Sequence, residues 1–81
     1  MVRLTKDDIE KIYDELDRRI NEDIKDGNLP AREKYISEER ASRAQGVYGT
    51  IMAIVPNDNW RDIVWWMDEI EEKRYGKRVW E

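Results

Sequence analysis

The side chains best suited to catalysis or metal binding are scarce in this sequence. There is no histidine and no cysteine, which removes the commonest general base and metal ligand and all thiol chemistry. The only serines, Ser37 and Ser42, stand outside any nucleophile motif. The oxygen-rich stretches at 23–28 and 57–59 lack the spacing of a calcium-binding loop. We therefore expect no enzyme activity, no bound cofactor and no metal site.

Length and composition indicate one small folded domain over residues 1–81. The chain carries 15 basic and 19 acidic residues, a net charge of −4, and 40% of its residues are hydrophobic, which is too many for a disordered tail. No apolar run approaches the roughly 20 residues that span a bilayer, and the first residues have no secretory signal. These features predict a cytoplasmic protein that makes no membrane contact.

The first predicted element is an amphipathic helix over about 6–26. Apolar residues recur at three- and four-residue steps through this stretch, which places them on one helical face. Thr5 is a suitable N-cap, and Asp8 stands where the acid of a capping box belongs. Gly27 supplies the left-handed residue that commonly ends a helix.

A second helix is predicted over about 31–55, between Pro30 and Pro56. The stretch 47–55 is rich in β-branched residues, so a strand is the competing interpretation there. A break near Ser37 would separate a charged first half from an apolar second half. A continuous helix is favoured because the apolar residues of the second half share one helical face.

A third helix is predicted over about 59–74. Asn57, Asp58 and Asn59 are candidate N-caps, and Asn59 and Asp62 have the spacing of a capping box. The segment beyond Gly76 is expected to be a short, extended tail. Three helices joined by short connections predict an all-α fold, a compact single domain.

One face of the second predicted helix consists of small residues: Ser42, Gly46, Gly49 and Ala53. A glycine inside a helix costs about 1 kcal/mol relative to alanine, so close approach of another helix should offset two of them. Within one molecule, this approach would make the second helix the central one, covered by the first helix on one face and by the third on the other. Across two molecules, the same face would form a homodimer. The sequence favours the first interpretation and leaves the second open.

Trp65 departs from the apolar stripe of the third predicted helix and points to its solvent side, beside Arg61. An exposed tryptophan often marks a contact site, because tryptophan and arginine dominate interface hot spots. The alternative is that Trp65 packs under the first helix or under the tail. We predict a partner-binding surface formed by the third helix and the C-terminal aromatic residues: Arg61, Trp65, Trp66, Tyr75, Arg78 and Trp80.

Nucleic-acid mimicry and nucleic-acid binding are weaker hypotheses. The many carboxylates along the first helix suggest an acidic mimic of nucleic acid, but basic residues alternate with them, which is typical of a solvated face. A basic and aromatic cluster at 73–80 suits direct binding to nucleic acid, and the net negative charge opposes it. A nucleic-acid partner is therefore not expected.

Together these features predict a small, acidic, non-enzymatic protein-binding domain that acts sterically by docking on a macromolecular partner. Domains of this size and type are often accessory proteins, and phage-encoded inhibitors acting in the host cytoplasm are one such group; no residue carries this association. The first alternative is a self-associating structural or regulatory module that dimerises through the small-residue face. The second is the acidic nucleic-acid mimic.

Overall fold

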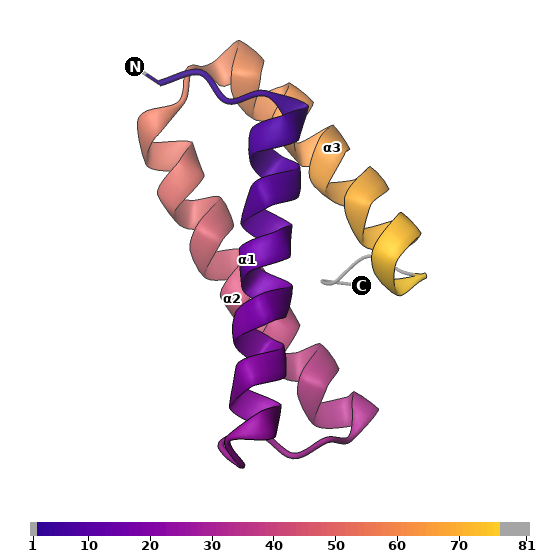
Figure 1. The fold of residues 1–81 in the computed structure, drawn as a ribbon. Helices are drawn as coiled ribbons and strands as arrows, with labels where there is room; N and C mark the ends of the chain where they lie inside the picture. Colours follow the sequence, from indigo (N-terminus) through magenta and orange to yellow (C-terminus); the bar gives the residue numbers. More distant parts are fainter. Residues whose placement is uncertain (1, 77–81) are drawn as a thin grey trace.

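The computed structural model describes residues 2–76 and has three helices, α1 (Lys6–Lys25), α2 (Glu33–Ile54) and α3 (Asn57–Tyr75) (Figure 1). The predicted all-α fold is confirmed, and each predicted helix boundary lies within two residues of the observed one. The predicted extended tail, 77–81, lies outside the described residues.

α2 is helical throughout its length. The stretch 47–54 belongs to it, so the competing strand is not formed, and residues 2–76 contain no strand at all. The hydroxyl of Ser37 donates to Oε1 of Glu33 one turn earlier at 2.9 Å. The helix is unbroken at this point, so the alternative of a break near Ser37 is not formed.

Both ends of α1 are built as the local sequence predicts. The hydroxyl of Thr5 accepts a hydrogen bond from the backbone N–H of Asp8 at 3.2 Å, and Oδ2 of Asp8 accepts one from the Thr5 N–H at 2.8 Å. These two bonds satisfy backbone donors that have no partner inside the helix. The Thr5 N–H, and then the Thr5 hydroxyl, donate to the Asp8 carboxylate, which holds the pKa of Asp8 below its usual value. Gly27, just past the helix, has φ of 78°, a conformation that glycine adopts without strain.

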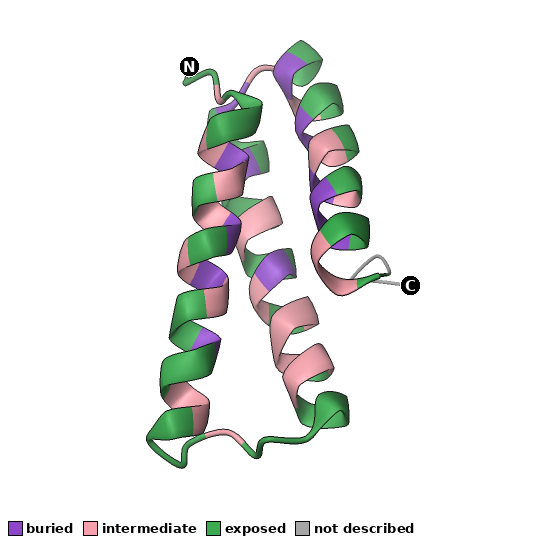
Figure 2. Ribbon diagram, turned by 45° about the vertical axis from the view of Figure 1, so that its right-hand side comes forward, coloured by how far each residue is buried: buried purple, intermediate pink, exposed green. Residues whose placement is uncertain are grey.

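α1, and not α2, is the central helix. It packs against both α2 and α3, whereas α2 and α3 contact each other only weakly. Figure 1 shows α2 and α3 diverging from the connection between them, while α1 runs alongside both. In α2 only Ala44 and Ile51 are buried, and most of the helix is coloured as intermediate or exposed in Figure 2. The prediction that α2 is the central helix is wrong. The apolar stripe of α1 packs against α2 along one side and against α3 along the other.

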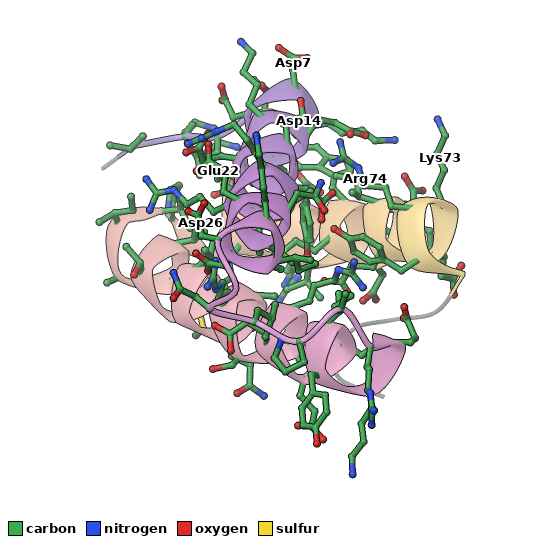
Figure 3. The ribbon with its side chains drawn as sticks, turned by 60° about the horizontal axis from the view of Figure 1, so that its bottom comes forward. Asp7, Asp14, Glu22, Asp26, Lys73 and Arg74 are labelled. Carbon is green, nitrogen blue, oxygen red and sulfur yellow. The ribbon has the colours of Figure 1, made fainter. Side chains whose placement is uncertain are left out.

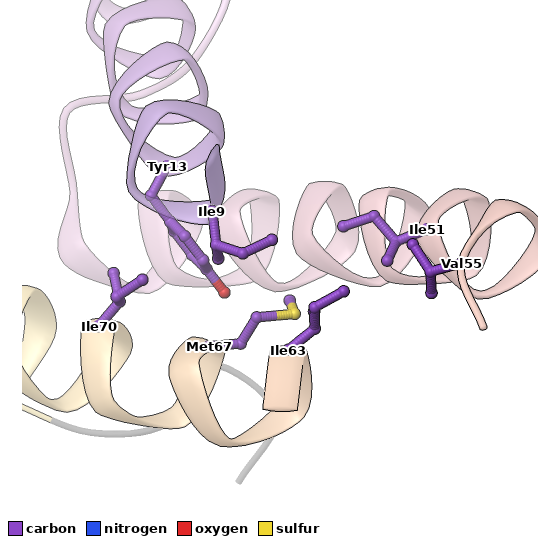
Figure 4. Close-up of a cluster of buried hydrophobic side chains, with 7 residues drawn as sticks. All are labelled: Ile9, Tyr13, Ile51, Val55, Ile63, Met67 and Ile70. Atoms are coloured by element: carbon purple, nitrogen blue, oxygen red, sulfur yellow. The ribbon is translucent and has the colours of Figure 1, made fainter. Parts of the chain in front are cut away.

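The buried core has two parts that follow from this arrangement. The larger cluster joins all three helices, and Figure 4 shows its side chains meeting between them: Ile9, Tyr13, Ile51, Val55, Ile63, Met67 and Ile70. The smaller cluster, Leu16, Ile20 and Ala44, joins α1 to α2. Fully burying one aliphatic side chain stabilises a fold by roughly 1.5–3 kcal/mol. The larger cluster, which contains the buried apolar residues of α3, therefore contributes to the attachment of this helix.

The start of α3 differs from the prediction. The helix begins at Asn57 after Pro56, and no side chain caps it. Asn59 lies inside the first turn, is buried, and forms hydrogen bonds with the backbone of Leu4. None of the three candidates is the N-cap, because Pro56 takes that position. The partner of Asn59 is 55 positions away in the chain, beyond the reach of any local pattern.

The small-residue face of α2 lies on the outside of the molecule. Its members, Ser42, Gly46, Gly49 and Ala53, are all exposed. A Cβ atom added at Gly46 or Gly49 would meet no atom within 4 Å. The close helix approach expected inside the molecule is therefore wrong. Nothing among residues 2–76 packs on these glycines, and the dimer alternative stays a prediction.

Candidate interaction site

Trp65 is the most exposed large hydrophobic residue that the structure describes, with 66% of its surface accessible. It is exposed on the outer face of α3, so the alternative that it packs under α1 is wrong. The tail, which was the other element that could cover it, lies outside the described residues. The indole Nε1 of Trp65 donates to Oε1 of Glu69 at 2.6 Å, and Oε2 of Glu69 accepts from the ammonium of Lys6 at 2.9 Å. These two donors, Lys6 first, lower the pKa of Glu69. The chain thus holds the polar edge of the indole and leaves its ring in solvent.

Charged residues surround Trp65 within one helical turn. Arg61 and Asp62 precede it by four and three positions, and Asp68 and Glu69 follow it by three and four. Residues at these spacings are neighbours on a helix surface. Three carboxylates therefore surround the ring, together with the guanidinium of Arg61 and the ammonium of Lys6 on Glu69, so these groups carry one net negative charge.

Trp66 and Tyr75, two other residues of the predicted surface, face the interior. Trp66 is half-buried and packs against the larger core cluster. The hydroxyl of Tyr75 donates to Oδ1 of Asp17 on α1 at 2.7 Å. The guanidinium of Arg40 on α2 stacks on the Tyr75 ring, 3.8 Å from its centroid. Tyr75 therefore joins all three helices and does not belong to the outer face of α3.

Of the six residues predicted for the partner-binding surface, the structure brings two together on the outer face. These are Arg61 and Trp65, both exposed and one helical turn apart. Arg78 and Trp80 lie outside the described residues. The candidate site is therefore smaller than the sequence predicts and is centred on one tryptophan.

The carboxylates of α1 that face α3 converge on a single arginine. The guanidinium of Arg74 binds Glu10 at 2.8 Å, Asp14 at 2.7 Å and Asp17 at 3.1 Å. Figure 3 shows Asp14 and Arg74 on the neighbouring sides of these two helices. A guanidinium has five donors in a planar fork, which allows one side chain to serve several carboxylates.

On the other side of α1, Glu15 binds both Arg18 and Arg19. Hydrogen bonds from these two arginines lower the pKa of Glu15 to about 2. Glu22 also pairs with Arg18, at 2.6 Å. Much of the negative charge of α1 is thus neutralised inside the molecule, which weakens the hypothesis of a nucleic-acid mimic.

Glu71 is the buried charged residue that the sequence interpretation missed. It is fully buried on α3 and accepts a hydrogen bond from the hydroxyl of Tyr13 on α1. Burial, and then the hydrogen bond to this carboxylate, raise the pKa of Tyr13 above its usual value. The available signal was the position of Glu71, four residues after the core residue Met67 and therefore near the inner face of α3.

Comparison of the chain with family models, with curated proteins and with solved structures finds no match. Within residues 2–76, no helix is both long and apolar enough to cross a membrane. In the same part of the chain, no group of three or more acidic side chains is arranged to hold a metal ion. The geometry of the surface is therefore the basis for a functional proposal.

Proposed function

We propose that this chain is a protein-binding domain that docks on a macromolecular partner through the outer face of α3. The observation that carries the proposal is the 66% exposure of Trp65 on a helix whose opposite face is fully used by the core. Leaving an indole in water forgoes roughly 1.5–3 kcal/mol of burial, which a binding partner would recover. Tryptophan and arginine are also the residues that most often dominate binding energy, and Arg61 lies one turn away.

Trp65 is suited to this role because its side chain has little conformational freedom to lose on binding. It stands on the middle of a rigid helix, and the bond to Glu69 holds its indole nitrogen. Immobilising a flexible side chain costs about 0.5–1.5 kcal/mol on binding, and an ordered anchor avoids part of that cost. Docking of the ring into a pocket would act sterically, as in an inhibitor or an accessory protein.

The charges around Trp65 indicate the chemistry of the partner. Asp62, Asp68 and Glu69 outnumber Arg61 within one turn of the ring, and one negative charge remains after Lys6 pairs with Glu69. The complementary surface is an apolar pocket with basic side chains at its rim. Rim charges mainly control the association rate and its salt dependence, so binding should weaken as salt rises.

The test compares two exposed aromatic residues on different helices. Trp65→Ala removes the anchor, and Tyr35→Ala, at an exposed position near the start of α2, is the matched control. Each variant is immobilised, proteins retained from a cell lysate are quantified by mass spectrometry, and the purified candidate is then titrated. We expect a candidate bound by wild type and by Tyr35→Ala, with a loss of about 30-fold or more in affinity for Trp65→Ala.

Thermal melts of the same variants separate binding from folding. Because both side chains are exposed, both substitutions should change the free energy of unfolding by no more than about 0.5 kcal/mol. The proposal fails if no retained protein depends on Trp65. It also fails if Trp65→Ala keeps full binding and instead melts at a clearly lower temperature.

A further inference from the structure

An open groove runs between α1 and α2, with a volume of about 1120 Å³. It is lined by α1, α2 and the segment before α1, and no described residue of α3 lines it. Its wall is largely apolar, with Ile12 and Leu16 from α1 and Val47, Ile51 and Ile54 from α2. The apolar surface in this groove is therefore not covered by α3.

The rim of the groove carries charge that is balanced within the chain. Three arginines and three acidic residues line it: Glu15, Arg18, Arg19, Glu22, Asp23 and Arg43. Each of them takes part in an ion pair with another member of the set. The rim therefore has no net charge, so it does not select a charged occupant. We expect an uncharged surface to bind in the groove.

The outer face of α2 is such an uncharged surface. Residues 44–54 contain no charged side chain, in a chain in which 42% of residues are charged. Several members of this stretch are exposed: Gln45, Gly46, Gly49, Thr50, Met52, Ala53 and Ile54. A helix that is uncharged and partly apolar all round is typical of a buried helix. Here one side of that helix faces solvent.

The groove and the uncharged face form one continuous surface. Gly46, Thr50 and Ile54 belong to both, because they line the groove from α2 and are exposed. A twofold dimer needs a single self-complementary patch that contains both the receiving and the inserting part. Here the receiving part is the groove between α1 and α2, and the inserting part is the uncharged face of α2.

We propose that a second copy of this chain occupies the groove, with residues 45–54 of each α2 packed against the other in a twofold dimer. The glycines at 46 and 49 present no side chain, so two helix backbones can approach closely there. The rim charges sum to zero, so the net charge of −4 of each copy comes from residues outside this contact. The dimer does not depend on Trp65, which lies on α3, so the two proposals stand or fall separately.

The size of the patch sets the expected strength of the dimer. A standard interface buries about 800 Å² per partner, which is roughly a seventh of the 5573 Å² surface of this chain. The uncharged half of α2 is about 16 Å long at 1.5 Å per residue, so the contact lies at the small end of the range. We expect reversible association with a dissociation constant on the order of micromolar.

The test is the mass of the protein in solution as a function of concentration. Sedimentation equilibrium from about 1 to 500 μM brackets the expected dissociation constant, and the mass should rise from 9.8 kDa toward twice that value. Gly46→Arg places a charge in the contact and should keep the protein monomeric throughout. A Cβ atom at position 46 meets nothing in the monomer and arginine favours helix, so its melting temperature should not fall.

Two further variants identify the surface that associates. Tyr35→Arg adds the same charge near the start of α2, outside the patch, and should dimerise like wild type. Trp65→Ala should also dimerise like wild type. The proposal is overturned by a constant mass of 9.8 kDa for wild type, which would leave the groove to a different partner. It is equally overturned if Gly46→Arg dimerises, or if Trp65→Ala abolishes association.

Discussion

The side-chain amide of Asn59 pairs with both backbone groups of Leu4. Its Oδ1 accepts from the Leu4 N–H at 2.7 Å, and its Nδ2 donates to the Leu4 carbonyl at 2.9 Å. The N–H of Val2 donates in turn to the carbonyl of Ile54 at 3.0 Å. The segment before α1 is thereby attached to the beginning of α3 and to the end of α2. These bonds close one end of the bundle, where the three helices meet.

Removing the amide should weaken this closure. We expect Asn59→Ala to lower the free energy of unfolding by about 1–3 kcal/mol, because the backbone groups of Leu4 lose buried partners. Urea denaturation measures the change. Asn57→Ala, at an exposed position two residues earlier, is the control and should change stability by less than about 0.5 kcal/mol. Equal effects of the two substitutions would show that the amide contributes nothing specific.

The hydrogen bond from Tyr13 to the buried Glu71 predicts a strong energetic coupling between the two residues. We expect the single substitutions Tyr13→Phe and Glu71→Leu, combined in a double-mutant cycle, to give a coupling energy of about 1–3 kcal/mol. The reason is that loss of the hydroxyl leaves a buried carboxyl with one donor fewer. Stability is again measured by urea denaturation. Additive effects, within about 0.5 kcal/mol, would mean that this bond does not stabilise the fold.

The lowered pKa of Glu15 predicts a pH dependence of stability. Arg18 and Arg19 lower this pKa from 4.5 to about 2 in the folded protein. The stabilisation that these arginines provide is therefore complete above the unfolded pKa and is lost as the pH falls from about 4.5 toward 2. Glu15→Gln should be less stable than wild type at neutral pH, and the difference should disappear in that acid range.

The same comparison in high salt is the control for the pH series. Glu15 and its two partners are exposed, so salt should screen their interaction and reduce the difference at neutral pH. Denaturation curves recorded at each pH and salt concentration give the result. A difference between wild type and Glu15→Gln that is unchanged at about pH 2 would contradict the assignment.

The helices themselves could be predicted because their determinants are local. Thr5 and Asp8 of the capping box are only three positions apart, and Gly27 ends α1 by its own backbone preference. The position of Trp65 opposite the core stripe of α3 follows from helical periodicity alone. The sequence did not decide whether Trp65 is exposed, because another helix or the tail could have covered it.

The arrangement of the helices was decided only by tertiary contacts. Asn59 and Glu71 find their partners 55 and 58 positions away, so no local pattern could show that one is a structural clamp and the other a buried acid. The glycines of α2 were expected inside the molecule, yet packing placed α1 at the centre and left them in solvent. Periodicity tells which side of a helix is apolar. Which neighbour covers that side depends on how three apolar surfaces are buried together, and that is a property of the whole chain.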